Sequence, residues 1–495
     1  MLRDEPVPSL RVPVREERSA AVVLTDRSKL LVAFDLLLAV LTGWLIWRSL
    51  DWPLVGDATI FHFIANQMAM GAVPYRDIVD INMPLTYDIH AAIVALAGMS
   101  DAAWRAFDLA AAALLSVCIL MLVRPAGRAE AMLAMLAVLL MHLLLGRYAA
   151  GQRDFLMTIP AVVAAWASAR AAEDRPHRHN LLALAGAFAM TAATIKPSGA
   201  ALLALPALAT SLRWREMVSI AAGAAAVGMV VFGILAVRGG LGAFIVMIVD
   251  VLPAYSSLGA QPLPEVLKAL QWIAPMAGLA VAAVLAIGLP KPPRLRVIIG
   301  VAVFGLIHLL VQRKGWAYHV YPLGVGLACW GAFALAALPA RRVWASLAVM
   351  ALTLCWLVPS TVSQTDNDAA LRAASAMQSA LERHVPRGAR VQMLDSDSGA
   401  FLAMARAGMR QATPHIQWFS LLTANGTVRR DFLSAFEADP PAGVLLTNDQ
   451  WPKEAGFDAT DDWPAFSAIL RSRYDLTETG QSGFVLWRLY VRRAT

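Results

Sequence analysis

Charged side chains that could carry chemistry are gathered in a few polar segments between long apolar runs. Asp57 comes directly after the first apolar run and before a stretch whose apolar periodicity predicts a helix over 58–70. One interpretation is that Asp57 caps the beginning of that helix. The other is a carboxylate held at a membrane-facing cavity, where it would act as a general base. The sequence leaves both interpretations open.

A second polar cluster follows in the same loop and contains Tyr75, Arg76, Asp77 and Asp80. It ends at Asn82-Met83-Pro84, where a proline is suited to begin a helix. Alone, this cluster is equally well explained as a solvated loop, in which an Arg76–Asp77 surface pair has little energetic weight. We therefore assign these residues a supporting role at most.

A third segment runs from Arg147 to Asp154 and contains Gly151-Gln152-Arg153. Arg147 and Arg153 could bind a phosphate, and Asp154 could orient one of the two guanidinium groups. The alternative is that these arginines are ordinary interfacial residues whose charged ends reach out to water.

Further cations lie in or between apolar runs. Lys196 separates two apolar runs, and a lysine there is costly unless it meets water or an anion, so a functional role is predicted. In the segment 312–322, Arg313, Lys314 and His319 are candidates for anion contact. At least two of the aromatic residues Trp316, Tyr318 and Tyr321 are better explained by the belt that membrane proteins place at the lipid–water interface.

The composition defines the setting in which these residues act. Of the 495 residues, 58% are hydrophobic and only 16% are charged, which excludes a single soluble enzyme and a disordered chain. The net charge of +7 is therefore a matter of membrane topology, and no nucleic-acid partner is expected. The three cysteines lie in apolar runs without metal-ligand or disulfide spacing, and no cluster of metal ligands is apparent.

Eleven apolar runs are long enough to be considered membrane spans. They are 30–50, 103–123, 129–146, 155–171, 181–195, 198–212, 217–237, 272–289, 297–311, 320–338 and 343–360. The stretch 84–99 is also apolar but contains Asp88 and His90, so we predict a helix that lies at the surface. The polar residues 1–28 lack a cleavage site and are expected to form a cytoplasmic tail.

Basic residues between these runs predict the orientation. With residues 1–28 in the cytoplasm, every short cytoplasmic loop is basic, for example at Arg124 and Arg128. The loop 51–102 and the C-terminal residues 361–495 then lie outside, in the periplasm. Residues 29–360 form the predicted transmembrane domain, with 51–102 as its first periplasmic loop.

The C-terminal residues 361–495 alternate strand-like and helical patterns, which predicts a periplasmic α/β domain. The expected strands are at 390–394, 443–446 and 483–487, and the expected helices at 368–384 and 463–473. Polar residues follow two of these strands, at 395–399 and 447–449. They are either ordinary loop residues at strand ends or contacts to an acceptor glycan.

The order of the polar segments resembles a known family. Asp57, the Tyr75-Arg76-Asp77 segment, Gly151-Gln152-Arg153-Asp154, Lys196-Pro197 and the 314–322 segment look like the motifs of bacterial GT-C glycosyltransferases. The relatives meant are those of glycosyltransferase family 39, the protein O-mannosyltransferase and lipid A aminoarabinose transferase group. The resemblance covers roughly residues 30–330.

This resemblance implies a polytopic helical fold, a polyprenyl-phosphate sugar donor and an acceptor in the cell envelope. Asp57 matches the family's catalytic aspartate, and Asp154 its second acidic position. Lys196 matches a lysine near the donor phosphate, and Lys314 and His319 match a late polar segment beside the same cavity.

One departure concerns the first loop. Where relatives often carry a lysine before the prolines, this chain reads Asn82-Met83-Pro84. A phosphate contact from that loop is therefore in doubt.

The hypothesis from the sequence is an inverting transfer in the bacterial inner membrane. Asp57 would take the acceptor's proton, while Arg153, Lys196 and either Lys314 or His319 would stabilise the departing polyprenyl phosphate. No cofactor is required, although Asp57 and Asp154 could in principle hold a divalent metal ion. The alternatives are a transporter or flippase of lipid-linked glycans and a non-catalytic protein of an envelope complex.

Overall fold

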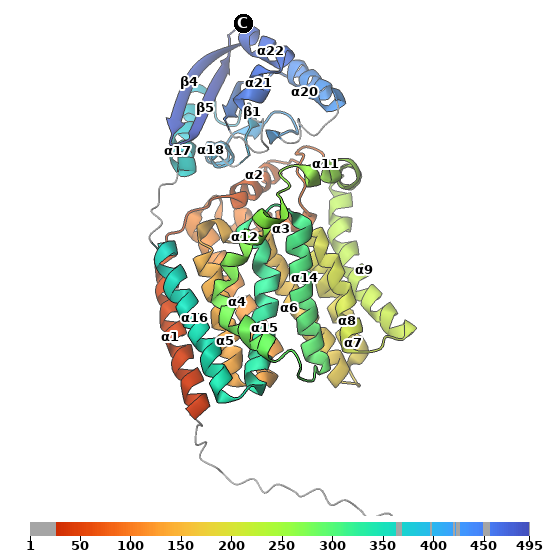
Figure 1. Ribbon diagram of the computed structural model, residues 1–495. Helices are drawn as coiled ribbons and strands as arrows, with labels where there is room; N and C mark the ends of the chain where they lie inside the picture. The colour runs from red at the N-terminus through yellow and green to blue at the C-terminus, as the bar shows by residue number, and fades with distance from the viewer. Residues whose placement is uncertain are drawn as a thin grey trace, which may run out of the picture.

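The computed structural model describes residues 26–362, 369–396, 398–418, 421, 426–448 and 456–494. It consists of a bundle of long helices with a small domain stacked on one end of the bundle (Figure 1). All the predicted apolar runs are helical. They correspond to α1 (Asp26–Arg48), α4 (Asp101–Val123), α5 (Arg128–Leu144), α6 (Arg153–Glu173), α7 (Arg178–Ile195), η3 with α8 (Pro197–Ala204 and Leu205–Ala209), α9 (Trp214–Val237), η5 with α13 (Ala269–Met276 and Ala277–Leu285), α14 (Pro293–Gln312), α15 (Tyr321–Ala337) and α16 (Ala340–Val362).

Eight helices in the described part of the chain are long and apolar enough to cross a membrane, which confirms a multi-pass membrane fold. The other predicted spans are shorter or more polar. Helix α5 has 17 residues, at the lower limit for crossing the hydrocarbon core. Helix α7 begins with polar Arg178-His179-Asn180, and η3 with α8 forms only a short apolar helix over Pro197–Ala209. The number of eleven spans therefore stays a prediction.

Small residues let neighbouring helices of the bundle approach closely. A Cβ atom added to Gly186 of α7 would lie 2.0 Å from the carbonyl oxygen of Ile220 in α9. The reciprocal contact is equally tight, since a Cβ atom on Gly223 would lie 1.9 Å from the carbonyl oxygen of Ala183. Backbone-to-backbone packing of this kind is typical of helix pairs in membranes, where apolar burial alone does not drive association.

Short helices occupy the end of the bundle that faces the small domain (Figure 1). The first loop forms α2 (Asp57–Ala69) and α3 (Pro84–Ala97), as its periodicity predicts. With 14 residues, α3 is too short to cross a bilayer, in agreement with its prediction as a surface helix. The later loops at this end add α10 (Leu241–Val246), a π-helical turn η4 (Met247–Val251), α11 (Leu252–Ser257), α12 (Leu263–Lys268) and the single turns η2 (Arg147–Ala149) and η6 (Ala317–Val320). The turn η1 (Arg124–Ala126) joins α4 to α5 at the opposite end of the bundle.

The C-terminal domain is an α/β domain, as predicted. Its five-stranded sheet has the order β2-β1-β3-β5-β4, in which β1 is parallel to β2 and β3, and β5 is antiparallel to β3 and β4. The elements are α17 (Ala369–His384), β1 (Arg390–Leu394), α18 (Ala400–Arg406), β2 (Arg410–Gln411), α20 (Gly426–Ala438), β3 (Gly443–Thr447), α21 (Phe457–Asp461), α22 (Pro464–Arg473), β4 (Tyr474–Ser482) and β5 (Val485–Arg492).

The three expected strands are β1, β3 and β5, while the two-residue strand β2 and the long strand β4 were not expected. Strand β4 reads Tyr-Asp-Leu-Thr-Glu-Thr-Gly-Gln-Ser and is mostly exposed at the edge of the sheet. Because neither of its faces is apolar, it lacks the alternation by which a half-buried strand is recognised.

Asp397 and Asp449, which belong to the polar segments after the expected strands, lie outside the described residues.

Hydrogen bonds attach the C-terminal domain to the first loop. The backbone N–H of Val79 donates to the carbonyl oxygen of Pro414 at 2.8 Å. The side chain of Gln67 donates to the carbonyl oxygen of Met409 at 2.9 Å and accepts from the N–H of Gln411 at 3.0 Å. Apolar side chains of α2 and α18 also share one hydrophobic core. The domain is therefore fixed above the loop that carries Asp57.

Candidate active site

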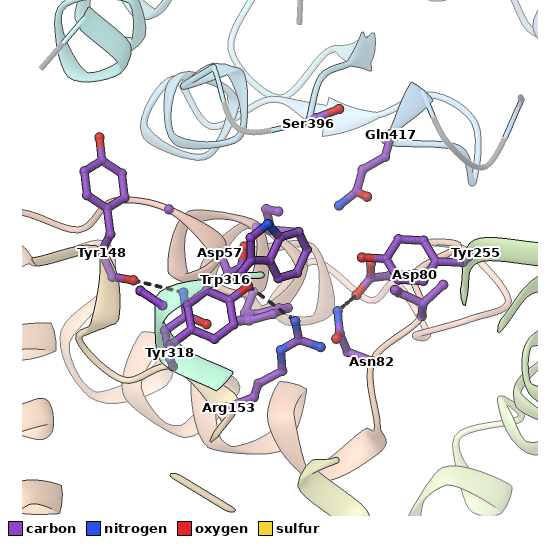
Figure 2. A pocket seen from close by; sticks show the side chains of 16 residues that line it. Asp57, Asp80, Asn82, Tyr148, Arg153, Tyr255, Trp316, Tyr318, Ser396 and Gln417 are labelled. Carbon is purple, nitrogen blue, oxygen red and sulfur yellow. Dashed lines mark hydrogen bonds and ion pairs between the residues drawn. The ribbon is translucent and has the colours of Figure 1, made fainter. Parts of the chain in front are cut away.

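A cavity of about 430 Å³ lies where the first loop, the beginning of α6 and η6 meet beneath the C-terminal domain. Figure 2 shows Arg153 at its floor, Asp57 with Tyr318 on one side, Asp80 with Asn82 on the other, and Ser396 and Gln417 above. Its lining residues are Gly56, Asp57, Ile60, Phe61, Asp80, Ile81, Asn82, Tyr148, Gln152, Arg153, Tyr255, Trp316, Ala317, Tyr318, Ser396 and Gln417. Two carboxylates and a guanidinium group thus face one partly open cavity.

Asp57 is the first residue of α2, but it does not cap the helix. The N-cap position is taken by Gly56, with φ +62°, and no side chain caps this helix end. The Asp57 carboxylate instead accepts hydrogen bonds at Oδ2 from Arg153 Nη2 at 3.3 Å and from the Tyr318 hydroxyl at 3.2 Å. The capping interpretation is therefore wrong, and the structure places Asp57 at the cavity.

Arg153 is the first residue of α6 and forms the floor of the cavity (Figure 2). Of the described residues that line this space, it alone carries a positive charge. Its side chain is 13% exposed, and its guanidinium carbon lies 5.2 Å from the centre of the Phe61 ring. Cation–π contact of this kind holds the planar group in a fixed orientation without using its hydrogen-bond donors. The remaining donors can therefore meet an anion in the cavity.

Asp80 lies across the cavity from Asp57 and is almost completely buried. Burial raises its pKa above the ordinary value, although hydrogen bonds from the Tyr87 hydroxyl and the Asn82 amide act in the opposite direction. The Asn82 amide donates to Asp80 at 2.5 Å, and the Tyr75 hydroxyl donates to the Asn82 carbonyl at 2.6 Å. Asn82 thus holds the side chain of a carboxylate that lines the cavity.

Arg76 and Asp77 lie outside the cavity. Arg76 donates to both carboxylate oxygens of Asp77 at 2.8 Å, and both side chains are exposed to solvent. Asp77 also accepts a hydrogen bond from the backbone N–H of Val73. This geometry matches the interpretation of the two residues as a surface pair in a solvated loop.

Asp154 and Lys196 form a buried ion pair that does not line the cavity. The Lys196 ammonium lies 2.8 and 2.9 Å from the two Asp154 oxygens. His308 of α14 completes the group, because its Nε2 lies 2.6 Å from Asp154 and its Nδ1 lies 2.9 Å from the Ser198 hydroxyl. In this structure the positive charge of Lys196 faces the protein's own carboxylate.

Lys314 and His319 also lie outside the lining of the cavity. The Lys314 ammonium donates to the backbone carbonyl groups of Tyr255, Ser256 and Leu258 at the end of α11. Burial lowers the pKa of Lys314 to about 8. The His319 ring is buried against the rings of Trp316, Tyr318 and His308. Lys314 thus secures the segment that brings Tyr255 to the cavity, and His319 supports Tyr318.

Tyr318 was not among the predicted site residues, because aromatic residues beside a span are expected in the interfacial belt. Its contact with Asp57 joins positions 261 residues apart in the sequence. No local signal distinguishes a belt tyrosine from one that faces a carboxylate. Tyr255 and Trp316, which also line the cavity, were missed for the same reason.

A buried polar network that the prediction also missed supports the loop before Arg153. Asp108 of α4 accepts a hydrogen bond at 2.6 Å from the backbone N–H of Gly151, two residues before Arg153. Asp108 also pairs with Arg105, and its Oδ2 lies 3.1 Å from His142 Nε2. His142 Nδ1 in turn lies 2.7 Å from the Tyr321 hydroxyl. Ionisable residues inside an apolar run indicate a functional site. The positions of Arg105 and Asp108 within the run 103–123 could therefore have indicated this network from the sequence.

Within the described ranges, no group of three or more His, Cys, Asp and Glu side chains is arranged to hold a metal ion. The carboxylates of Asp57 and Asp154 bind different partners, Arg153 with Tyr318 and Lys196 with His308 respectively. The predicted possibility of a divalent ion between these two aspartates remains an expectation.

The arrangement of membrane helices, first-loop helices and an α/β domain over the cavity is similar to the fold of solved GT-C proteins, in agreement with the fold that the motif order implied. The similar solved structures include ArnT from Cupriavidus metallidurans in the apo state, with 14% identity and a TM-score of 0.57 over 92% of this chain and 98% of that chain. The same protein bound to undecaprenyl phosphate gives 14% identity and a TM-score of 0.60 over the same shares. At such identities the similarity shows the fold alone.

A third solved structure, the apo oligosaccharyltransferase of Archaeoglobus fulgidus, is 12% identical over 86% of this chain and 70% of that chain. Its TM-score of 0.49 is too low to support an argument. No family model matches the sequence, and no curated protein matches it significantly.

Proposed function

We propose that this protein is an inverting glycosyltransferase that moves a sugar from a polyprenyl-phosphate donor to a cell-envelope acceptor. The acceptor is a glycan, lipid or protein, and the reaction takes place at the periplasmic face of the bacterial inner membrane. The observation that carries the proposal is the Asp57 carboxylate beside Arg153 in a cavity at one end of a membrane bundle. The fold shared with ArnT, whose structure has been solved with undecaprenyl phosphate, supports the choice of donor.

Asp57 is suited to act as the general base. Its two hydrogen bonds from described residues both end on Oδ2, so Oδ1 is available to an acceptor hydroxyl. In the proposed step, Oδ1 takes the hydroxyl proton while the acceptor oxygen bonds to the anomeric carbon. The bond from that carbon to the phosphate oxygen breaks at the same time, and the configuration inverts.

Arg153 is suited to stabilise the leaving group. The electron pair of the broken bond departs with polyprenyl phosphate, whose negative charge grows in the transition state. A guanidinium group fixed by Asp57 and Phe61 in a poorly hydrated space needs no reorganisation to meet that charge. Lys196, Lys314 and His319 do not line this space, so the proposal assigns the direct phosphate contact to Arg153.

The size of the cavity agrees with a sugar substrate. A volume of about 430 Å³ lies in the range of pockets that enclose small molecules. Ser396 and Gln417 of the C-terminal domain face the same space. We infer that they contact the acceptor, because the membrane-anchored donor reaches the cavity from the bundle and the acceptor from the side of the domain.

The test compares Asp57→Asn with Asp77→Asn, a matched change of an exposed carboxylate in the same loop. Purified variants in liposomes receive lipid-linked sugars and envelope glycans extracted from the source bacterium. The assay measures the release of free polyprenyl phosphate. Loss of a positioned general base lowers the rate by about 10²–10⁴-fold, so Asp57→Asn should be nearly inactive and Asp77→Asn fully active.

The same assay distinguishes the alternative functions. A flippase would move lipid-linked glycans across the bilayer without releasing polyprenyl phosphate, and an assembly protein would do neither. Transfer by Asp57→Asn at a near wild-type rate would show that the assigned role of Asp57 is wrong.

A further inference from the structure

A second cavity, of about 960 Å³, lies at the end of the bundle opposite the candidate active site. It is formed by the end of α4, the beginning of α5, the last turns of α6 and the beginning of α14. Its lining residues are Val117, Leu120, Met121, Arg124, Pro125, Arg128, Ala131, Met132, Trp166, Arg170 and Arg294. We call this cavity the arginine groove, because its charged lining residues are all arginines.

Two of these arginines form ion pairs with carboxylates of the protein itself. Arg294 donates to both oxygens of Glu173 at 2.9 and 2.6 Å and to the carbonyl oxygen of Leu122 at 3.0 Å. Arg170 contacts Glu173 at 3.3 Å and Asp174 at 3.7 Å. These two arginines join α6 to α14 and leave little net charge between them and their partners.

The other two, Arg124 and Arg128, are exposed on the turn between α4 and α5. Within the described part of the chain, neither of them forms an ion pair. Both face the same groove, so their two positive charges lie together without a counter-charge from the described residues. A net charge of this kind is complementary to an anion.

The wall beside these charges is apolar and open to the surroundings. Val117 and Met121 of α4 are 52% and 44% exposed, and Met132 of α5 is 39% exposed. The spacing from Val117 to Met121 is four residues, and from Met121 to Arg124 in the following turn η1 it is three. Residues at this spacing lie on one face of a helix. From Arg124 to Val117 the groove follows α4 for about 10 Å towards the middle of the bundle. Charge at the helix end and apolar surface deeper in the membrane match the shape of a phospholipid.

We propose that the arginine groove binds an anionic phospholipid, with its headgroup phosphate at Arg124 and Arg128 and an acyl chain along Val117, Met121 and Met132. Arginines bind phosphate oxygens through paired hydrogen bonds, and basic pockets between membrane helices are suited to anionic headgroups. A zwitterionic lipid offers the same chains without the net charge, so the arginines select the anionic lipid. This site is independent of the proposed glycosyl transfer.

The experiment measures the unfolding temperature of the full-length protein in detergent while lipids are added. The probes are phosphatidylglycerol, phosphatidylcholine with the same chains, and inorganic phosphate. The tested variant is R124Q/R128Q. The control is R341Q/R342Q, which removes two exposed arginines from the first turn of α16, at the same end of the bundle but outside the groove.

Phosphatidylglycerol is expected to raise the unfolding temperature of the wild type and of the control far more than phosphatidylcholine or phosphate does. In R124Q/R128Q its apparent affinity should fall by about 30-fold, since each arginine near a lipid headgroup contributes about fivefold. Equal stabilisation by phosphatidylcholine or by phosphate alone would overturn the proposal. Equal loss in both double variants, or a dimer that forms through this face and leaves no lipid bound, would overturn it as well.

Discussion

Replacing Lys196 tests whether its buried ammonium serves the donor phosphate or the protein's own carboxylate. Its Nζ lies within 2.9 Å of both Asp154 oxygens. Asp154 is fully buried and Lys196 is 5% exposed. The substitution Lys196→Met removes the charge and keeps most of the chain volume, so Asp154 loses its ion pair and keeps its contact with His308.

The expected effect follows from this burial. Removing one partner of a buried ion pair costs about 3–5 kcal/mol, because the other charge remains without compensation. The Nε2 atom of His308 lies 2.6 Å from Asp154 and still contacts the carboxylate, which places the expected loss near the lower end, about 3 kcal/mol. The double variant Lys196→Met with Asp154→Asn has no stranded charge. We expect it to recover about 2 kcal/mol of the loss, within the range of coupling energies for residues in contact.

The assay is thermal and denaturant unfolding of the purified protein in detergent, with Lys291→Met as the control. Lys291 is an exposed lysine that donates to the carbonyl oxygen of Ile287, so the same chemical change there should have little effect. Donor binding is measured on the same preparations. If Lys196→Met is as stable as the wild type and loses only donor binding, the ammonium serves the phosphate, and the reasoning from the ion pair is refuted.

Three further predictions concern the support of the site. Tyr318→Phe removes one of the two hydrogen bonds to Asp57, and a bond to a charged group is worth about 1.5–3 kcal/mol. The transfer rate should fall at least about tenfold with unchanged folding, and an unchanged rate would argue against the contact. Asp108→Asn deprives buried Arg105 of its counter-charge, so the unfolding free energy should drop by about 3 kcal/mol, and an unaltered unfolding temperature would contradict the network. Burial lowers the pKa of His62 to about 4, so the unfolded chain binds more protons between about pH 4 and 6.5. Stability should therefore fall by about 2 kcal/mol from pH 7.5 to pH 5, and His62→Gln should have a shallower pH dependence. The same slope in that variant would exclude His62 as the cause.

The helices of this protein are largely predictable from the sequence, because the thickness of the bilayer imposes the length of each apolar run. The surface helix over 84–99 was also predictable, since Asp88 and His90 interrupt an otherwise apolar stretch. Strand β4 was not, because it packs at the sheet edge with polar residues on both faces.

The partners of the charged residues were less predictable than their positions. Lys196 and Asp154 are 42 residues apart, and the ion pair between them arises from the packing of α6 beside α7 and η3. Lys314 meets the carbonyl groups at the end of α11, which has no charged residue that could have indicated the contact. A sequence shows where a charged side chain lies within an apolar region. The group that pairs with this charge depends on which helices pack against each other in the fold.

The geometry of Asp57 depends on groups far from the first loop. Asp108 holds the backbone at Gly151, which places Arg153 at the floor of the cavity beside Asp57. From the other side, the C-terminal domain is hydrogen-bonded to the first loop at Val79 and adds its own side chains to the cavity. The first loop supplies the Asp57 carboxylate, the bundle supplies Arg153, and the domain adds Ser396 and Gln417 to the same cavity. Under the proposed function, we therefore expect substitutions of Ser396 or Gln417 to change which acceptor fits without altering Asp57 or Arg153. In the proposed transfer, the first loop and the bundle would thus determine the chemistry, and the domain would determine the choice of acceptor.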